Sequence, residues 1–283
     1  MKIYPLNTGN FKLDGGAMFG VVPKTLWSRT NEADENNMCS WAMRSMLIED
    51  GDRLMLIDTG IGDKQSEKFF SYYYMFGDDS LKGNLKKLGF SPDDITDVFL
   101  THLHFDHCGG AVERIGENRY APVFKNATFW STEKHWKWAT EPNAREKASF
   151  LSENILPIEE SGQLKFVTRT GDFSKEVFKD IDLLFVDGHT ESQMIPHIRY
   201  KGKTLVFMAD LLPSVGHIPL PFVMGYDTRP LLTLTEKEKF LKKAAKEEYI
   251  LFLEHDHLNE CCTLKETEKG IRLDQTFKFN EIF

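Results

Sequence analysis

Three of the nine histidines in the sequence fall within six residues, in the run THLHFDH at positions 101–107. His102 and His104 are two residues apart, so in an extended segment their side chains point to the same face and can bind one ion together. The glycine pair that follows the run indicates a turn, which would direct Asp106 and His107 toward a second ion. Imidazole and carboxylate groups at this density are typical of zinc, iron or manganese sites. The run therefore predicts metal-dependent chemistry.

A surface loop is the alternative explanation, and for any single histidine it would be the better one. The cluster argues against it, because the run directly follows the apolar residues 98–100, which are typical of a buried strand. Buried histidines and carboxylates without partners are costly, so we favour the metal hypothesis. Of the other histidines, we expect His135 to be exposed or packed on a helix and His197 to lie in a core or to face a partner.

Two metal shells need more ligands than this run supplies, and three other apolar runs each end in a residue that could serve. These residues are His189, Asp210 and His255, and the runs before them begin at positions 183, 205 and 250. A histidine or carboxylate at the carboxyl end of a buried strand is the expected source of a further ligand. The sequence therefore predicts a complete binuclear site.

The order of apolar and helical patterns predicts an α/β chain. The expected strands cover residues 41–48, 54–57, 98–100, 183–186, 204–208 and 250–253, and the expected helices cover residues 81–88, 132–139, 145–156 and 236–248. Thr235 and Glu238 have the spacing of a capping box at the start of the last helix. No Pro/Gly/Ser-rich linker divides the chain, and the candidate ligands come from both halves. We therefore expect a single domain over residues 1–283.

The ligand pattern resembles the metallo-β-lactamase superfamily, and two further segments support the resemblance. They are LIDTG at residues 56–60 and GHT at residues 188–190. The resemblance implies a four-layer αββα sandwich, with the site at the edge between the two sheets. It also implies that Asp58 is not a ligand but hydrogen-bonds near the site and orients it.

The same resemblance implies a ligand set for two divalent cations. One ion would be held by His102, His104 and His189, the other by Asp106, His107 and His255, and Asp210 would bridge them, with a hydroxide between the ions. Two cations lower the pKa of a bridging water to near neutrality, which provides a nucleophile at pH 7. A carboxylate beside such a water can take part in proton transfer, so Asp106 is also a candidate catalytic residue. Zinc is the expected metal, with iron or manganese as alternatives.

The substrate has to be inferred from residues outside the ligand set, because one fold hosts many reactions. The segment 11–20 and the apolar Phe105 look similar to the branch that contains N-acyl homoserine lactone lactonases, related esterases and organophosphate hydrolases. That branch would suit a partly apolar small molecule. Lactonases often have a tyrosine three residues beyond the bridging aspartate, whereas Pro213 stands there in this chain. Tyr226 and His217 are therefore the candidate donors to a developing oxyanion, with a structural role in the loop as the alternative for each.

Hydrolysis of a small ester or lactone is the leading hypothesis. Phosphodiester or phosphotriester hydrolysis at the same ions is the nearest alternative, and a non-catalytic ligand-binding protein on the same fold is a third. A β-lactamase proper is disfavoured because no secretory signal is evident and because the second metal would be held by Asp106 rather than a cysteine. A diiron oxygen-reducing protein is disfavoured because its motif commonly has a glutamate where His104 stands.

The composition is that of an ordinary globular protein, with 41% hydrophobic and 28% charged residues. The net charge of −8 and the lack of aromatic-flanked basic runs argue against nucleic-acid binding. The amino terminus lacks the apolar region of a secretory signal and no apolar stretch is long enough to span a bilayer, so we expect a cytoplasmic protein without membrane association. The four cysteines do not form a disulfide pattern. The expected partner is a small-molecule substrate, and the chain is compatible with a homodimer.

Overall fold

A computed structural model describes residues 1–283 of the protein. The chain divides into two compact units, each assembled from two separate stretches. Unit 1 comprises Met1–Phe11 and Met43–Thr168, and unit 2 comprises Lys12–Ala42 and Arg169–Phe283. Both units combine strands with helices, so the predicted α/β class is confirmed. The single domain over the whole chain stays a prediction.

Unit 1 is built on a six-stranded sheet with the strand order β1-β2-β3-β4-β7-β8. Its strands are β1 (Lys2–Asp14), β2 (Met38–Asp50), β3 (Arg53–Ile57), β4 (Asp97–Phe99), β7 (Thr128–Ser131) and β8 (Leu164–Phe166), of which β1 and β2 continue beyond the unit. β3 and β4 are parallel neighbours, and Ile57 pairs with Phe99 at their carboxyl ends. The loops that begin at Asp58 and Leu100 therefore start side by side.

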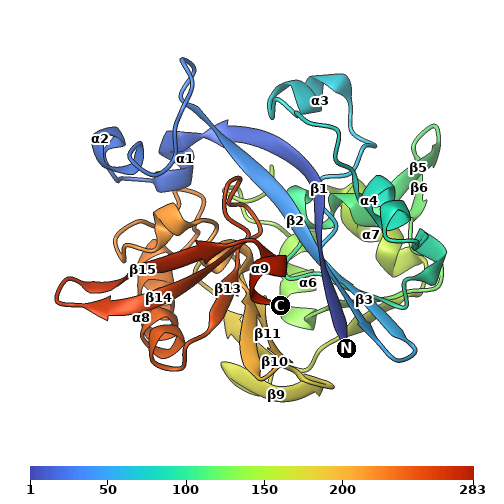
Figure 1. The fold of residues 1–283 in the computed structure, drawn as a ribbon. Coiled ribbons are helices and arrows are strands. Elements are labelled where there is room, and N and C mark those ends of the chain that lie inside the picture. The colour runs from blue at the N-terminus through green and yellow to red at the C-terminus, as the bar shows by residue number, and fades with distance from the viewer. The chain divides into compact units, whose positions relative to one another are not determined.

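Unit 1 has five helices, four of which place apolar side chains in one core. They are α3 (Glu67–Ser71), α4 (Leu81–Lys87), α5 (Phe105–Cys108), α6 (Glu133–Thr140) and α7 (Ser152–Glu160), accompanied by the turns η1 (Pro92–Asp94) and η2 (Gly109–Ala111) and the hairpin of β5 (Val112–Gly116) and β6 (Arg119–Pro122) (Figure 1). Leu85 of α4, Trp136 of α6 and Ile155 of α7 pack in the same buried cluster as Leu56 and Phe129 of the sheet. Burying these side chains is the main force that holds the helices in place.

The helix predicted over residues 145–156 begins later than expected and ends later. Residues 145–149 form turns, and α7 runs over Ser152–Glu160. The reason lies in Asn143, whose Oδ1 accepts hydrogen bonds from the backbone N of Arg145 (2.9 Å) and of Glu146 (3.1 Å). Such a local side-chain turn competes with helical hydrogen bonding. The prediction was therefore wrong for the first half of this segment.

Unit 2 contains a seven-stranded sheet with the order β15-β14-β13-β12-β11-β10-β9. Its strands are β9 (Phe173–Phe178), β10 (Ile181–Val186), β11 (Gln193–Tyr200), β12 (Lys203–Phe207), β13 (Ile250–Phe252), β14 (Cys261–Thr267) and β15 (Gly270–Phe277). Only β12 and β13 are parallel neighbours, and Phe207 pairs with Phe252 at their carboxyl ends. Asp210 and His255 each lie three residues beyond this pair. All six predicted strands are present in the two sheets.

The longest helix, α8 (Pro230–Lys246), connects β12 to β13 and packs against β14 (Figure 1). Parallel strands need such a long crossover. The predicted start at residue 236 was wrong, because Pro230 occupies the first turn, where its missing N–H has no cost. Thr235 lies inside the helix and its Oγ1 donates to Leu231 O (3.2 Å), so the predicted capping box is absent.

The other helices of unit 2 are short. They are α1 (Gly15–Phe19), α2 (Lys24–Trp27) and α9 (Phe279–Ile282), with the turns η3 (Ala209–Leu211) and η4 (Val215–His217). None of the helices in the chain combines the length and the apolar composition that a membrane span requires.

His197 of β11 is the core histidine that the sequence predicted. Its ring packs edge-on against Phe173, Phe240 and Tyr249, and Nδ1 donates to Ile195 O (3.0 Å). Burial lowers the pKa of His197 to about 4. The imidazole is therefore neutral in the folded protein at neutral pH.

We expect His197 to make the protein less stable in mild acid. The unfolded chain takes up a proton near pH 6.5 and the folded chain only near pH 4, so stability is complete above about pH 6.5 and falls as the pH drops through that window. At pH 5 the loss is about 2 kcal/mol. Chemical denaturation at pH 7.5 and pH 5 should show a smaller loss for His197→Phe than for the unchanged protein. The exposed His257→Gln variant is the control, and equal losses in all three proteins would contradict the assignment.

Candidate metal centre

His102 and His104 lie in the extended loop that follows β4, and their rings converge. His102 Nε2 and His104 Nδ1 are 3.1 Å apart. The backbone between the two histidines is fixed by His135 of α6, whose Nε2 accepts a hydrogen bond from Leu103 N (2.8 Å). His135 is buried, so the exposed position considered for it was wrong and its packing position is confirmed.

Asp58 directly follows β3, and its carboxylate contacts residues at both ends of the histidine run. One carboxylate oxygen accepts from Thr101 N (2.8 Å), and the other accepts from Thr101 Oγ1 (2.6 Å) and faces His107 Nδ1 at 3.0 Å. The Asp58 side chain is fully buried and its backbone has a φ of 55°, a strained conformation for a residue other than glycine. Asp58 therefore fixes the orientation of the His107 ring through its Nδ1.

The turn that carries His107 has no room for side chains on the two glycines that follow it. A Cβ on Gly109 would lie 2.2 Å from Ile61 O, and a Cβ on Gly110 would lie 2.2 Å from Thr59 O. Thr59 also donates to His107 O from its backbone N (2.7 Å) and from Oγ1 (2.9 Å). The glycine pair thus permits the close packing of the two loops that fixes α5.

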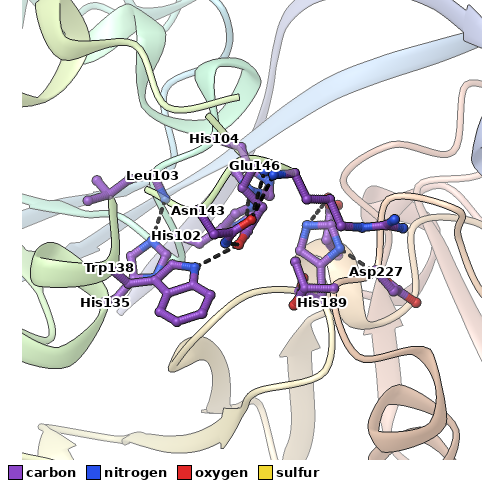
Figure 2. A network of polar contacts seen from close by, with 12 residues as sticks. His102, Leu103, His104, His135, Trp138, Asn143, Glu146, His189 and Asp227 are labelled. Atoms are coloured by element: carbon purple, nitrogen blue, oxygen red, sulfur yellow. Dashed lines mark hydrogen bonds and ion pairs between the residues drawn. The ribbon is translucent and has the colours of Figure 1, made fainter. Parts of the chain in front are cut away.

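The other ring nitrogen of His104 faces Glu146. His104 Nε2 lies 3.4 Å from Glu146 Oε1, while Trp138 Nε1 (2.7 Å) and Asn143 Nδ2 (2.6 Å) donate to Glu146 Oε2. Figure 2 shows the three side chains around the carboxylate of Glu146. No sequence pattern singled out Glu146, which lies in the stretch where a helix was predicted.

In unit 2, Asp210 lies between two histidines. Asp210 Oδ2 is 3.1 Å from His189 Nε2, and Asp210 Oδ1 is 3.1 Å from His255 Nε2. Each carboxylate oxygen thus faces a different imidazole, which is the arrangement expected of a carboxylate that bridges two ions. Ala209, directly before it, has a φ of 40°, and strained backbone of this kind persists where surrounding contacts hold it.

The second ring nitrogen of each of these histidines, Nδ1, also has a polar partner. His189 Nδ1 lies 2.9 Å from Asp227 Oδ1 (Figure 2), and His255 Nδ1 donates to Ala42 O (2.8 Å). Burial lowers the pKa of His189, but Asp210 and Asp227 outweigh it and raise the pKa to about 10. Without metal the imidazole is therefore a cation between two carboxylates, and metal binding at Nε2 requires the loss of that proton.

The five candidate histidines share one feature. In each of them an oxygen atom lies beside one ring nitrogen, and this contact sets the direction in which the second ring nitrogen points. The oxygens belong to Thr101 for His102, Glu146 for His104, Asp58 for His107, Asp227 for His189 and Ala42 for His255. Metal-binding histidines almost always donate their second N–H in this way. In the neutral tautomers that these contacts favour, two lone pairs face each other at His102 and His104, and a shared cation would relieve their repulsion. The donor set therefore fits divalent metal ions of the zinc type.

The two candidate oxyanion donors differ in their surroundings. His217 is buried and stacked on Phe19, and its Nδ1 and Nε2 lie 2.9 Å from Ser214 Oγ and from Met18 O. Burial lowers the pKa of His217 to about 3. These contacts occupy both ring nitrogens and give His217 a packing role, whereas Tyr226 is 40% exposed.

The comparison with protein families identifies the superfamily. A model described as the metallo-beta-lactamase superfamily matches residues 44–255, which is more than half of the chain. The chain therefore belongs to the metallo-β-lactamase superfamily, and it is a metal-dependent hydrolase of that superfamily. An N-acyl homoserine lactonase of Bacillus thuringiensis is 26% identical over 223 residues, which cover 74% of this chain and 79% of the lactonase.

Solved structures confirm the metallo-β-lactamase fold. A probable metal-dependent hydrolase from Staphylococcus aureus has 29% sequence identity and a TM-score of 0.85, with 98% of both chains covered. The dizinc quorum-quenching lactonase AidC, solved in complex with a product, has 22% identity and a TM-score of 0.75, with 98% of this chain and 95% of AidC covered.

Proposed function

We propose that the protein is a binuclear metal-dependent hydrolase that cleaves a small ester or lactone. His102, His104 and His189 would hold one divalent cation, Asp106, His107 and His255 the second, and Asp210 would bind both, with zinc as the proposed metal. The observation that carries the proposal is the facing pair of imidazole nitrogens at His102 and His104. The position of Asp210 between His189 and His255 supports the same ligand set.

Two such cations would lower the pKa of a coordinated water and polarise the carbonyl oxygen under attack. The chain's own residues would supply orientation and proton transfer. The Asp106 carboxylate, 3.9 Å from His107 Nε2, would take up the proton that the water loses as it attacks the carbonyl carbon. Tyr226 is the proposed donor to the developing oxyanion, since both ring nitrogens of His217 already have partners.

The aromatic surroundings of the histidine run support a partly apolar substrate. Phe105, between two proposed ligands, contacts Phe69 and Tyr73 of the α3 region, with ring centroids 5.4 Å and 4.8 Å apart. Apolar walls with a few polar groups are the usual lining of a small-molecule site. The similarity to an N-acyl homoserine lactonase favours the lactone among the possible ester substrates.

We expect the zinc-loaded protein to hydrolyse a lactone or carboxylic ester with a kcat/KM of about 10⁴ M⁻¹s⁻¹ or more. The measurement is a panel of lactones, carboxylic esters, thioesters, phosphodiesters and phosphotriesters, followed by initial rates. An Asp106→Asn variant purified in the same way controls for contaminating esterases. A preference for phosphotriesters or phosphodiesters would replace the proposed substrate with the phosphoester alternative. Metal binding without turnover on any member of the panel would favour the ligand-binding protein.

A further inference from the structure

Glu146 is a buried carboxylate that no ligand set includes. It is 2% exposed and lies in the turn segment between α6 and α7. Trp138 Nε1 and Asn143 Nδ2 both donate to its Oε2, at 2.7 Å and 2.6 Å. With that oxygen held by two donors, the other oxygen is directed at His104 Nε2, at 3.4 Å (Figure 2).

A carboxylate in this position decides which nitrogen of His104 carries the proton. As an acceptor, Glu146 Oε1 favours the tautomer with a proton on Nε2, so Nδ1 keeps its lone pair. Nδ1 is the atom that faces His102 Nε2. A hydrogen bond from a ligand imidazole to a carboxylate also makes the imidazole a stronger metal ligand.

We propose that Glu146 is a positioning residue for His104: it holds the ring in the Nε2–H tautomer and thereby sets the metal affinity of Nδ1. The inference rests on the proposed metal centre and adds a residue to it. Trp138 and Asn143 contribute to the same positioning, because their hydrogen bonds to Oε2 prevent the Glu146 carboxylate from rotating away from His104.

The Glu146→Gln variant tests the proposal. Trp138 and Asn143 both need an acceptor, so the amide oxygen would replace Oε2 and the amide NH₂ would face His104. Nε2 would then have to accept, which moves the ring proton to Nδ1. Titrating zinc-loaded protein with a competing chelator should show zinc affinity weakened by about 10–100-fold. Cobalt in place of zinc should show altered visible absorption bands, and the melting temperature of the metal-free protein should change little.

Two further variants make the result decisive. Glu159→Gln, on the exposed side of α7, is the matched control and should bind zinc like the unchanged protein. Trp138→Phe keeps an aromatic ring but removes one donor, so it should weaken zinc binding less than Glu146→Gln does, and it carries the test if Glu146→Gln does not fold. Unchanged zinc affinity in the folded Glu146 or Trp138 variant would overturn the proposal. Because the zinc measurement needs no substrate, a failure of the proposed ester or lactone activity leaves this result standing.

Discussion

The Asp210→Asn variant is expected to lose activity by about three orders of magnitude or more, which corresponds to ~4 kcal/mol of transition-state stabilisation. In the folded chain each oxygen of Asp210 faces one imidazole, His189 or His255, at 3.1 Å. Asparagine offers one oxygen and one NH₂ group, so one of the two proposed metal positions loses its ligand. The variant also removes a negative charge that would offset the charge of the two proposed cations. Rates on the best substrate and metal content by elemental analysis are the measurements.

A matched control separates this effect from the loss of any carboxylate. Asp274 of β15 is exposed and pairs with Lys265 on the neighbouring strand. Asp274→Asn should keep full activity and full metal content, because surface ion pairs contribute little. If Asp210→Asn retains both metals and more than a tenth of the activity, Asp210 does not bind the two ions.

The candidate ligands could be predicted because they follow a local rule. Asp210 and His255 each come three residues after a buried parallel strand, and His102 comes three residues after Phe99 of β4. Apolar runs that end in a histidine or an aspartate are visible in a single sequence, so the strands and the candidate ligands were predicted together. The glycines at 109 and 110 were visible as a turn signal, although their tight packing on the loop after β3 was not.

Apart from Thr101, which directly precedes His102, the partners of the histidines follow no local rule. Glu146 contacts a histidine 42 positions away, Asp227 one 38 positions away, and Ala42 one 213 positions away. Ala42 contributes only a backbone carbonyl, which no side-chain pattern can reveal. Such partners are set by the folding of the units, and only the structure identifies them.

The helix boundaries show a different limit. Thr235 and Glu238 have the spacing of a capping box, but positions three apart also lie on one face inside a helix. The true start at Pro230 depends on where the chain leaves the preceding loop. In the stretch before α7, the side chain of Asn143 replaces helical hydrogen bonds with a turn. Both errors concern the first residue of a helix, where one local sequence pattern is compatible with two different structures.

Asp58 is not a proposed metal ligand, but the position of the histidine run depends on it more than on any other residue outside the ligand set. Its Oδ1 accepts a hydrogen bond from the backbone N of Thr101. Its Oδ2 accepts from Thr101 Oγ1 and also faces Nδ1 of His107. Thr101 Oγ1 in turn lies 3.1 Å from His102 Nδ1. One carboxylate therefore determines the ring orientation of His107 directly and that of His102 through a hydroxyl.

We expect Asp58→Asn to lower kcat/KM by about 10²–10³-fold and zinc affinity by about 10–100-fold. The amide keeps one acceptor but presents an NH₂ group either to Thr101 or to His107 Nδ1. In the second case Nδ1 must accept, the proton moves to Nε2, and the nitrogen proposed to bind metal is blocked. Asp63→Asn, an exposed change on the same loop, should leave rate and affinity unchanged. Stability should fall by about 1–3 kcal/mol, the cost of an unsatisfied buried group; a loss of stability with unchanged zinc affinity in the folded variant would make Asp58 a purely structural residue.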